Sequence, residues 1–505
     1  MTLVPTPGRH SAHASRAASQ AAWTGLLRDP LASDIDGRVV VHVPAPPPPP
    51  LPGAATEQVT RWPIPRSRRS LPTGWPIAAA VALWPLWWAL GVTNLVLPAC
   101  GLALAWQLRR ARVVLPPGFW LWGLFLLLVA FSVLAINSDL AGTTTSDGLG
   151  RYLAFGLRYL NYLAVTLMLL YVGNTTEAEL PRRRIIRWMG MLGVSCILLG
   201  VLALFLPDFS FTTPASYLLP AALRDGSAVV ELAQFQPVLG DPAPRPAAPF
   251  GFTNAWGNVT SLLLVWLVVG WGVVGSSRRR LALGVLLCLA LPALVYSLNR
   301  AMWLCLALVV VVLVVRLALW GRVRALVALV ALGTVLAVGT VATPLDSLVG
   351  SRLSTGHSNE IRQSLLQDAF EAAKQSPVVG FGTTRKARGS EASIAIGPSE
   401  ACPRCGGRNI GSTGQLTLLL ISQGFLGVLL YGGFLLQVLW RYARDHSVIG
   451  LAATLVVGME LFYAGFYAAL SMPLAIVFLS IGLLWRNEQL RSRRHEPAAA
   501  EGGAS

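Results

Sequence analysis

Long, nearly uncharged apolar stretches recur along the chain, and they constrain its fold more than any other feature. Of the 505 residues, 54% are hydrophobic and only 12% are charged, about half the charged fraction of soluble domains. A helix of about 20 apolar residues crosses the hydrocarbon core of a bilayer. We therefore predict an all-α, polytopic transmembrane helix bundle of about twelve spans, the second and the last of them short. The predicted spans are residues 75–92, 95–108, 117–137, 151–173, 188–206, 254–275, 281–297, 301–320, 325–343, 415–440, 448–470 and 473–485.

Short basic clusters alternate regularly with these spans. With twelve spans, every cluster falls on the same side of the bundle, and the positive-inside rule makes that side and both termini cytoplasmic. The net charge of +17 then belongs to loops that face anionic lipid headgroups, and nucleic acid is not an expected partner. The clusters lie within residues 66–69, 109–112, 182–187, 278–280, 322–324, 441–444 and 491–494.

The ends of the chain differ in composition from the predicted transmembrane domain, residues 75–486. Residues 1–70 contain a proline run and no apolar core of the kind a signal peptide needs. We expect a disordered, Pro-rich cytoplasmic tail there, and a second cytoplasmic tail over residues 487–505.

Two connections on the predicted outer face are long, residues 208–253 and 344–414, and loops of this length are usually functional or disordered. In the second, apolar residues recur at helical spacing between 361 and 373, with Ser376 and Pro377 ending the pattern. We expect an interfacial helix whose apolar side faces the spans and whose polar side is wet. We interpret Arg385 and Lys386, farther along, as ordinary loop charges.

Several arginines stand where the bilayer disfavours them. Arg300 interrupts two apolar runs at the predicted outer surface, where the orientation rule does not favour it. Arg158 lies inside the fourth predicted span, and Arg151, seven residues earlier, shares its helix face. Ionisable groups at such places are functional candidates by default, and an arginine grips phosphate or carboxylate at two points. A lipid-headgroup anchor is the alternative interpretation of Arg300.

Cys402 and Cys405 form a C-P-R-C sequence in the second outer loop. Because the outer face is oxidising, a local disulfide is our first interpretation. A zinc half-site would need two further ligands, which the neighbouring sequence does not offer. A thioredoxin-like role would need a strand–helix context that is also missing.

Four short segments resemble motifs of the O-antigen ligase and polymerase family. Residues 377–382 (PVVGFG) follow the loop helix, residues 411–416 (GSTGQL) and 423–427 (QGFLG) lead into and through the tenth span, and residues 297–301 (SLNRA) hold Arg300. The fourth is Arg245 with residues 249–254 (PFGFTN), before the sixth span. Each is short, but all occur in the family's order and at span ends.

This resemblance implies a GT-C-like membrane glycosyltransferase in a bacterial plasma membrane. Such proteins move a glycan from a polyprenyl-diphosphate carrier to a glycan or lipid acceptor on the outer face, in cell-surface polysaccharide assembly. They use no metal or other cofactor. The resemblance makes Arg245 and Arg362, with the arginines above, candidate ligands of the carrier's diphosphate.

One departure from the family concerns the base that activates the acceptor. Ligases of this family carry a loop histidine just before the tenth span, whereas residues 410–414 here (IGSTG) contain none. The nearest replacements are His357 and Glu360, one turn apart at the start of the loop helix, and both could equally be solvated loop residues. The alternative function is a transporter, such as a flippase of lipid-linked glycans. Glu460 in the eleventh span could be a proton-coupling carboxylate, and a pair with a neighbouring span and a cytoplasm-facing position are equal alternatives.

Overall fold

Helices make up nearly all of the regular structure. The computed structural model describes residues 71–109, 112–143, 149–218, 232–234, 245–319, 357–386 and 409–501, with the single residues 321, 323 and 327. Its elements are α3 (Trp75–Ala82), α4 (Trp84–Leu90), α5 (Thr93–Leu108), α6 (Phe119–Phe131), η1 (Ser132–Ala135), α7 (Leu149–Asn174), α8 (Arg182–Phe205), β1 (Ser210–Thr212), α9 (Pro214–Leu218), β2 (Leu232–Gln234), α11 (Thr253–Leu267), η2 (Val268–Val273), α12 (Ser277–Tyr296), α13 (Arg300–Leu319), α16 (His357–Gln375), β3 (Arg385–Lys386), β4 (Asn409–Ile410), α17 (Gln415–Tyr442), α18 (Val448–Tyr463) and α19 (Met472–Glu501).

The helices follow the predicted spans closely. Every predicted span contains a helix except 325–343, nearly all of which lies outside the described residues. Among the described residues, six helical segments are long and apolar enough to cross a membrane: α7, α8, α11 with η2, α12, α13 and α17. The apolar helices α5, α6 with η1, and α18 are shorter. The chain is therefore a helical, multi-pass membrane protein, whereas the count of twelve spans remains a prediction, as do the disordered tail at 1–70 and the loop boundaries. Helix α19 continues to Glu501, into the segment that the sequence assigned to the second tail.

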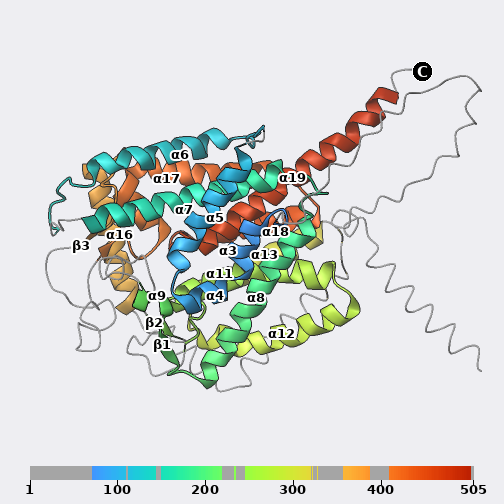
Figure 1. Ribbon diagram of the computed structural model, residues 1–505, viewed down its shortest axis with the longest axis horizontal. Coiled ribbons are helices and arrows are strands. Elements are labelled where there is room, and N and C mark those ends of the chain that lie inside the picture. The colour runs from blue at the N-terminus through green and yellow to red at the C-terminus, as the bar shows by residue number, and fades with distance from the viewer. Residues whose placement is uncertain are drawn as a thin grey trace, which may run out of the picture. The chain divides into compact units, whose positions relative to one another are not determined.

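Helices α6, α7, α17 and α19 pack around Trp122, and α6, α7 and α17 run side by side (Figure 1). Trp122 of α6 is fully buried there, and its indole N–H donates to Thr166 Oγ1 of α7 at 2.8 Å. Its ring lies 5.4 Å from that of Phe434 in α17 and 4.6 Å from that of Phe478 in α19. Tilted ring pairs of this kind stabilise a helix interface beyond the area they bury.

The basic helix ends meet at one end of the bundle. Arg182 at the start of α8 donates to Asn487 of α19 at 2.8 Å, and Arg441 at the end of α17 forms an ion pair with α19. Arg183 of α8 lies near enough to Arg279 of α12 for their charges to repel, so the start of α12 lies at the same end. The contacts thus gather clusters that the sequence predicted to share one membrane side.

Two strand pairs flank the helices. Strand β1 pairs antiparallel with β2, with Phe211 opposite Ala233, in the first of the predicted long loops. Strand β3 pairs antiparallel with β4, with Arg385 opposite Ile410, in the second. Each pair joins two distant points of a long connection, and the second pair packs beside α16.

Candidate functional site

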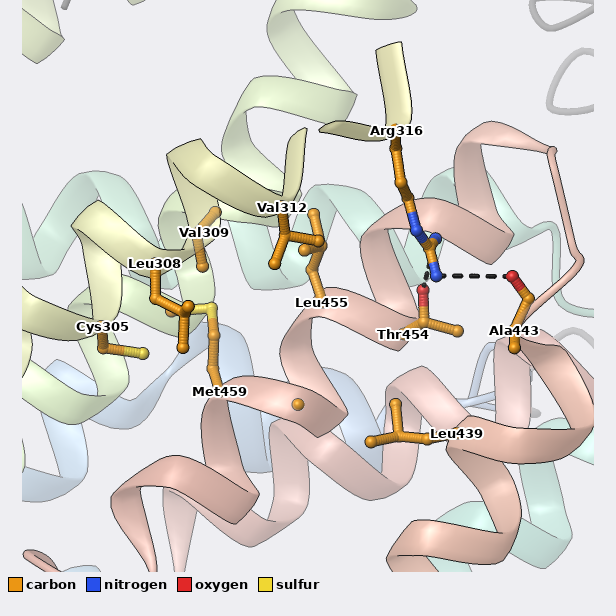
Figure 2. Close-up of a pocket in the computed structure, with 11 residues that line it drawn as sticks. Cys305, Leu308, Val309, Val312, Arg316, Leu439, Ala443, Thr454, Leu455 and Met459 are labelled. Atoms are coloured by element: carbon orange, nitrogen blue, oxygen red, sulfur yellow. Dashed lines mark hydrogen bonds between the residues drawn. The ribbon is translucent and has the colours of Figure 1, made fainter. Parts of the chain in front are cut away.

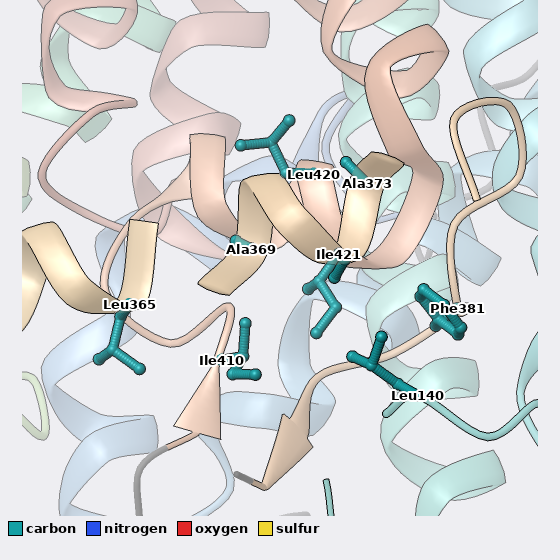
Figure 3. Packing of buried hydrophobic residues seen from close by; sticks show 9 residues of the cluster. Leu140, Leu365, Ala369, Ala373, Phe381, Ile410, Leu420 and Ile421 are labelled. Atoms are coloured by element: carbon teal, nitrogen blue, oxygen red, sulfur yellow. The ribbon is translucent and has the colours of Figure 1, made fainter. Parts of the chain in front are cut away.

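The predicted loop helix exists as α16, and its apolar side faces the bundle. Leu365, Ala369 and Ala373 are buried, and they pack with Phe381, Ile410 and Ile421 in the cluster that Figure 3 shows beneath the helix. Of the five side chains expected to be wet, Arg362 is half-buried, and the other four are exposed: Gln363, Gln367, Glu371 and Lys374. Leu366 and Phe370, which the pattern assigned to the apolar side, are 39% and 45% exposed. The Phe370 ring packs on Phe425 of α17, with ring centroids 5.2 Å apart.

A turn after α16 docks into a break in α17. Helix α17 leaves the helical conformation at Gly424, where φ is 64° and ψ is −164°. Across the break, the Phe381 N–H donates to Ile421 O at 2.8 Å and the Gly382 N–H to Ser422 O at 2.9 Å. The Leu426 N–H donates to Pro377 O at 3.2 Å. The PVVGFG and QGFLG motifs are therefore two halves of one backbone junction, which fixes α16 on the bundle.

Arg385 is a structural residue, which corrects its interpretation as a loop charge. Its side chain is 2% exposed, and its Nη2 donates to Ile136 O at 2.8 Å and to Phe381 O at 3.0 Å. Burial, and secondarily the nearby charge of Arg151, lower the pKa of Arg385 to about 10, while Asp139 opposes the shift. The guanidinium is still charged at neutral pH. It caps the carbonyls where α6 and η1 end, a role that loop composition could not reveal.

A cavity of about 270 Å³ opens beside the start of α11. Among the described residues, Arg245 is the only charged one that lines this cavity. Helix α11 begins at Thr253, and the first amide groups of a helix attract anions. The Thr253 side chain is 3% exposed, and its Oγ1 has no hydrogen-bond partner among the described residues. The cavity is lined by Arg245, Phe252, Thr253, Asn254, Ala255, Ser412, Thr413, Phe466, Tyr467 and Ala468.

Two predicted arginine segments meet at this cavity. The Arg245 Nε donates to Ser297 O at 3.0 Å, and Ser297 begins the SLNRA turn. In the same turn Leu298 has a φ of 50°, and Asn299 Oδ1 accepts a hydrogen bond from the Tyr467 hydroxyl. Arg300 is the next residue and the first of α13. The turn that carries Arg300 is therefore tied to the cavity wall at two points.

Arg362 of α16 belongs to the same group of charges. The positive charges of Arg362 and Arg245 both act on the Tyr467 hydroxyl, and Tyr467 lines the cavity. Arg245, Arg362 and the Arg300 turn thus come from three distant parts of the chain and converge around one tyrosine. An anion in this cavity would meet Arg245 and a helix N-terminus directly, and the charge of Arg362 acts on the same tyrosine.

Arg151 and Arg158 lie in a second group, on the side of α7 that faces α17 and η1. Arg158 Nη1 donates to Ser422 Oγ at 3.5 Å, and Arg151 Nη1 donates to Ile136 O at 3.3 Å. One turn after Arg158, the Tyr162 hydroxyl accepts from Gln415 Nε2 at 2.9 Å. These contacts place Arg158 beside the break in α17. Its neighbour Tyr162 contacts Gln415 of the GSTGQL segment, and Arg158 is not among the residues that line the cavity.

The central part of the chain matches a known family. Residues 283–432 match the family model described as O-antigen ligase. This stretch of the chain is therefore similar to an O-antigen ligase domain. This confirms the resemblance on which four short motifs agreed, and the matched segment holds three of them. Searches of curated proteins and of solved structures found no match.

Within the matched segment, the predicted catalytic residues are only partly described. His357 and Glu360 lie in the first turn of α16, but their side chains fall outside the described residues. Cys402 and Cys405 lie outside the described residues altogether, so their disulfide stays a prediction. In the part of the chain that the structure describes, no three His, Cys, Asp or Glu side chains cluster as metal ligands would.

Sequence reasoning missed two cavity residues. Tyr467 closes an aromatic stretch at the end of the eleventh predicted span, and nothing in its spacing distinguishes it from core. Thr253 lay inside a motif but was not singled out, because an unpartnered hydroxyl is visible only once its surroundings are known. The buried Thr253 hydroxyl without a hydrogen-bond partner among the described residues is the signal that identifies this residue, and only the tertiary structure shows it.

Proposed function

We propose that this protein transfers or polymerises a glycan from a polyprenyl-diphosphate carrier onto an acceptor, on the outer face of a bacterial plasma membrane. The O-antigen ligase domain supports glycan transfer or polymerisation in cell-surface polysaccharide assembly. The donor chemistry, the membrane face and a metal-independent mechanism are our proposal. The observation that carries it is the cavity at the start of α11, which combines Arg245, helix N-terminal amides and the buried Thr253 hydroxyl.

A diphosphate leaving group needs this combination. It leaves with at least two negative charges, which one arginine cannot neutralise. We propose that Arg362 and Arg300 add their charges to that of Arg245, because donors fixed before the reaction stabilise charge as it develops. Tyr467 holds the turn in place through Asn299. In this scheme the diphosphate occupies the cavity, and Arg151 and Arg158 bind the glycan or the outer part of the carrier along α17.

The acceptor hydroxyl must lose a proton as it attacks the sugar. His357 and Glu360 begin α16, the same helix that carries Arg362, so a base in this first turn would act near the proposed diphosphate site. A base in this position would contribute about 10²–10⁴-fold to the rate. We propose these two residues as the candidates that replace the family's loop histidine.

The competing proposal is transport of a lipid-linked glycan without bond cleavage. One observation favours it: Glu460 of α18 is fully buried beside Asn258 of α11. Buried carboxylates within membrane helices often belong to proton pathways. A flippase would move intact lipid-linked glycan across proteoliposomes and depend on Glu460. A transferase would release free polyprenyl diphosphate and tolerate Glu460→Gln.

The decisive experiment measures donor binding and glycan transfer separately, with the purified full chain and a purified lipid-linked donor. Lysine keeps the charge of Arg245 but loses the planar two-point grip. Arg245→Lys should therefore slow transfer by about a hundredfold, the usual effect of one oriented donor worth about 2–4 kcal/mol. Arg245→Ala should also weaken donor binding.

Arg280 offers a matched control. Its Nε donates to Gly272 O at 3.1 Å, the same kind of bond that Arg245 makes to Ser297 O, but at the basic end of the bundle. Arg280→Lys should transfer at the wild-type rate. If Arg245→Lys and Arg300→Lys also keep the wild-type rate, the cavity does not hold the diphosphate, and the proposed function loses its site.

A further inference from the structure

A second cavity shares no lining residue with the first, and its lining is mostly apolar. It has a volume of about 300 Å³ and runs between α13, α17 and α18, with Arg316 at one end (Figure 2). The other lining residues are almost all apolar. They are Cys305, Leu308, Val309, Val312, Leu439, Ala443, Thr454, Leu455, Gly458 and Met459.

This second cavity is an open groove, and one of its walls is α13, a helix whose apolar surface is mostly exposed. In α13 only 11% of the most apolar window is buried inside the protein, the smallest share among the candidate spans. Leu308 lines the groove and is 46% exposed, and Leu304 and Val311 beside it are more exposed still. Lipid chains around α13 therefore have direct access to the groove among the residues that the structure describes.

The length of the groove matches one leaflet. Cys305 and Arg316 are eleven residues apart on α13, which is about 16 Å of helix. The hydrocarbon core of a bilayer is about 30 Å thick. The groove thus has the depth that one acyl chain occupies in one leaflet, and it ends at an arginine where the headgroup of that lipid would lie.

Arg316 retains donors for an anion. Its Nη1 donates to Thr454 Oγ1 at 3.3 Å and its Nη2 to Ala443 O at 3.4 Å, both long bonds to neutral oxygens. The nearest acid, Asp445, is held by Arg491 at 2.8 Å. A guanidinium has five N–H donors, so most of those on Arg316 are not used by the described protein atoms.

We propose that this groove is a binding site for an anionic phospholipid, with one acyl chain along α13 and its phosphate on Arg316. Charge complementarity selects the anionic lipid, because a zwitterionic lipid brings its own cation to the same place. The site is independent of the diphosphate cavity, which lies at the opposite, Arg300 end of α13. Its failure would leave the proposed function untouched.

Gly458 allows the groove to be filled without disturbing the protein. A Cβ at this position would meet no atom within 4 Å, and the residue lies on the groove wall in α18. Gly458→Leu would therefore extend into the groove itself, and leucine is a better helix former than glycine. Gly284 of α12 also has open space around it and is exposed, so Gly284→Leu adds the same side chain outside the groove.

The test is photolabelling of the full chain in phosphatidylcholine liposomes that contain a trace of phosphatidylglycerol with a photoreactive acyl chain. Peptide mass spectrometry then measures adducts on residues 305–312 and 454–459. We expect unlabelled phosphatidylglycerol to compete about fivefold better than phosphatidylcholine, the effect of about 1 kcal/mol from one arginine. Arg316→Gln should reduce this preference to about one, whereas Arg187→Gln, at the same end of the bundle, should preserve it.

Gly458→Leu should abolish labelling of both groove segments, and Gly284→Leu should not. Adducts on the outward side of α13, at Leu304, report in every variant that the protein is inserted and folded. Equal competition by the two phospholipids would overturn the proposal, as would groove labelling that survives Gly458→Leu. Stronger competition by a polyprenyl phosphate than by phosphatidylglycerol would assign the groove to the carrier lipid instead.

Discussion

Replacing Gly424 with alanine should loosen the junction between α16 and α17. At φ 64° and ψ −164° the backbone lies in a region that is essentially restricted to glycine, and holding another residue there costs about 1–3 kcal/mol. The new Cβ would also lie 2.5 Å from the carbonyl oxygens of Ser376 and Pro377. Relieving that clash displaces the acceptor of the Leu426 N–H, a further loss of about 1 kcal/mol. We therefore expect the junction to be destabilised by about 2–4 kcal/mol.

Hydrogen exchange of the Phe381 and Gly382 amides measures this directly, because both donate across the break. A loss of 2 kcal/mol corresponds to about thirtyfold faster exchange. Gly433→Ala, in the same helix with no atom near the added Cβ, should leave these amides unchanged and stabilise α17 by up to about 1 kcal/mol. Wild-type protection in Gly424→Ala would refute the claim that this glycine is needed for the junction.

Three further predictions follow from the same contacts and from the chain's topology. Arg385→Met should destabilise the end of α6 by about 2–4 kcal/mol, because buried carbonyls lose their donor, and Lys386→Met, on the exposed neighbour, should have little effect on thermal unfolding in detergent. Thiol alkylation with and without reductant should show Cys402 bonded to Cys405 in protein from cells, and two free thiols under oxidising preparation would remove that disulfide. A single cysteine at Glu391 should react with an impermeant reagent from outside the cell, and labelling only from the cytoplasmic side would overturn the predicted orientation.

The sequence predicted the helices correctly where apolar runs or helical periodicity leave the backbone few alternatives. Apolar runs of membrane length must form helices, because lipid offers no partner for free backbone groups. The period of Leu365, Ala369 and Ala373 likewise defined α16 and its buried side before any contact was known. Short motifs predicted the O-antigen ligase resemblance because they recur at span ends in a fixed order.

The tertiary structure decided which side chains act together. Arg245, Arg362 and the Arg300 turn are separated by tens of residues, and no local period relates them, so only packing could bring them to Tyr467. The same packing placed Arg158 against Ser422 of α17 and buried Arg385, although the composition of its loop suggested solvent. Sequence periodicity indicates which face of a single helix is buried. A site also requires several elements to be placed relative to one another, and here the junction at Gly424 and the contacts between helix ends set that placement.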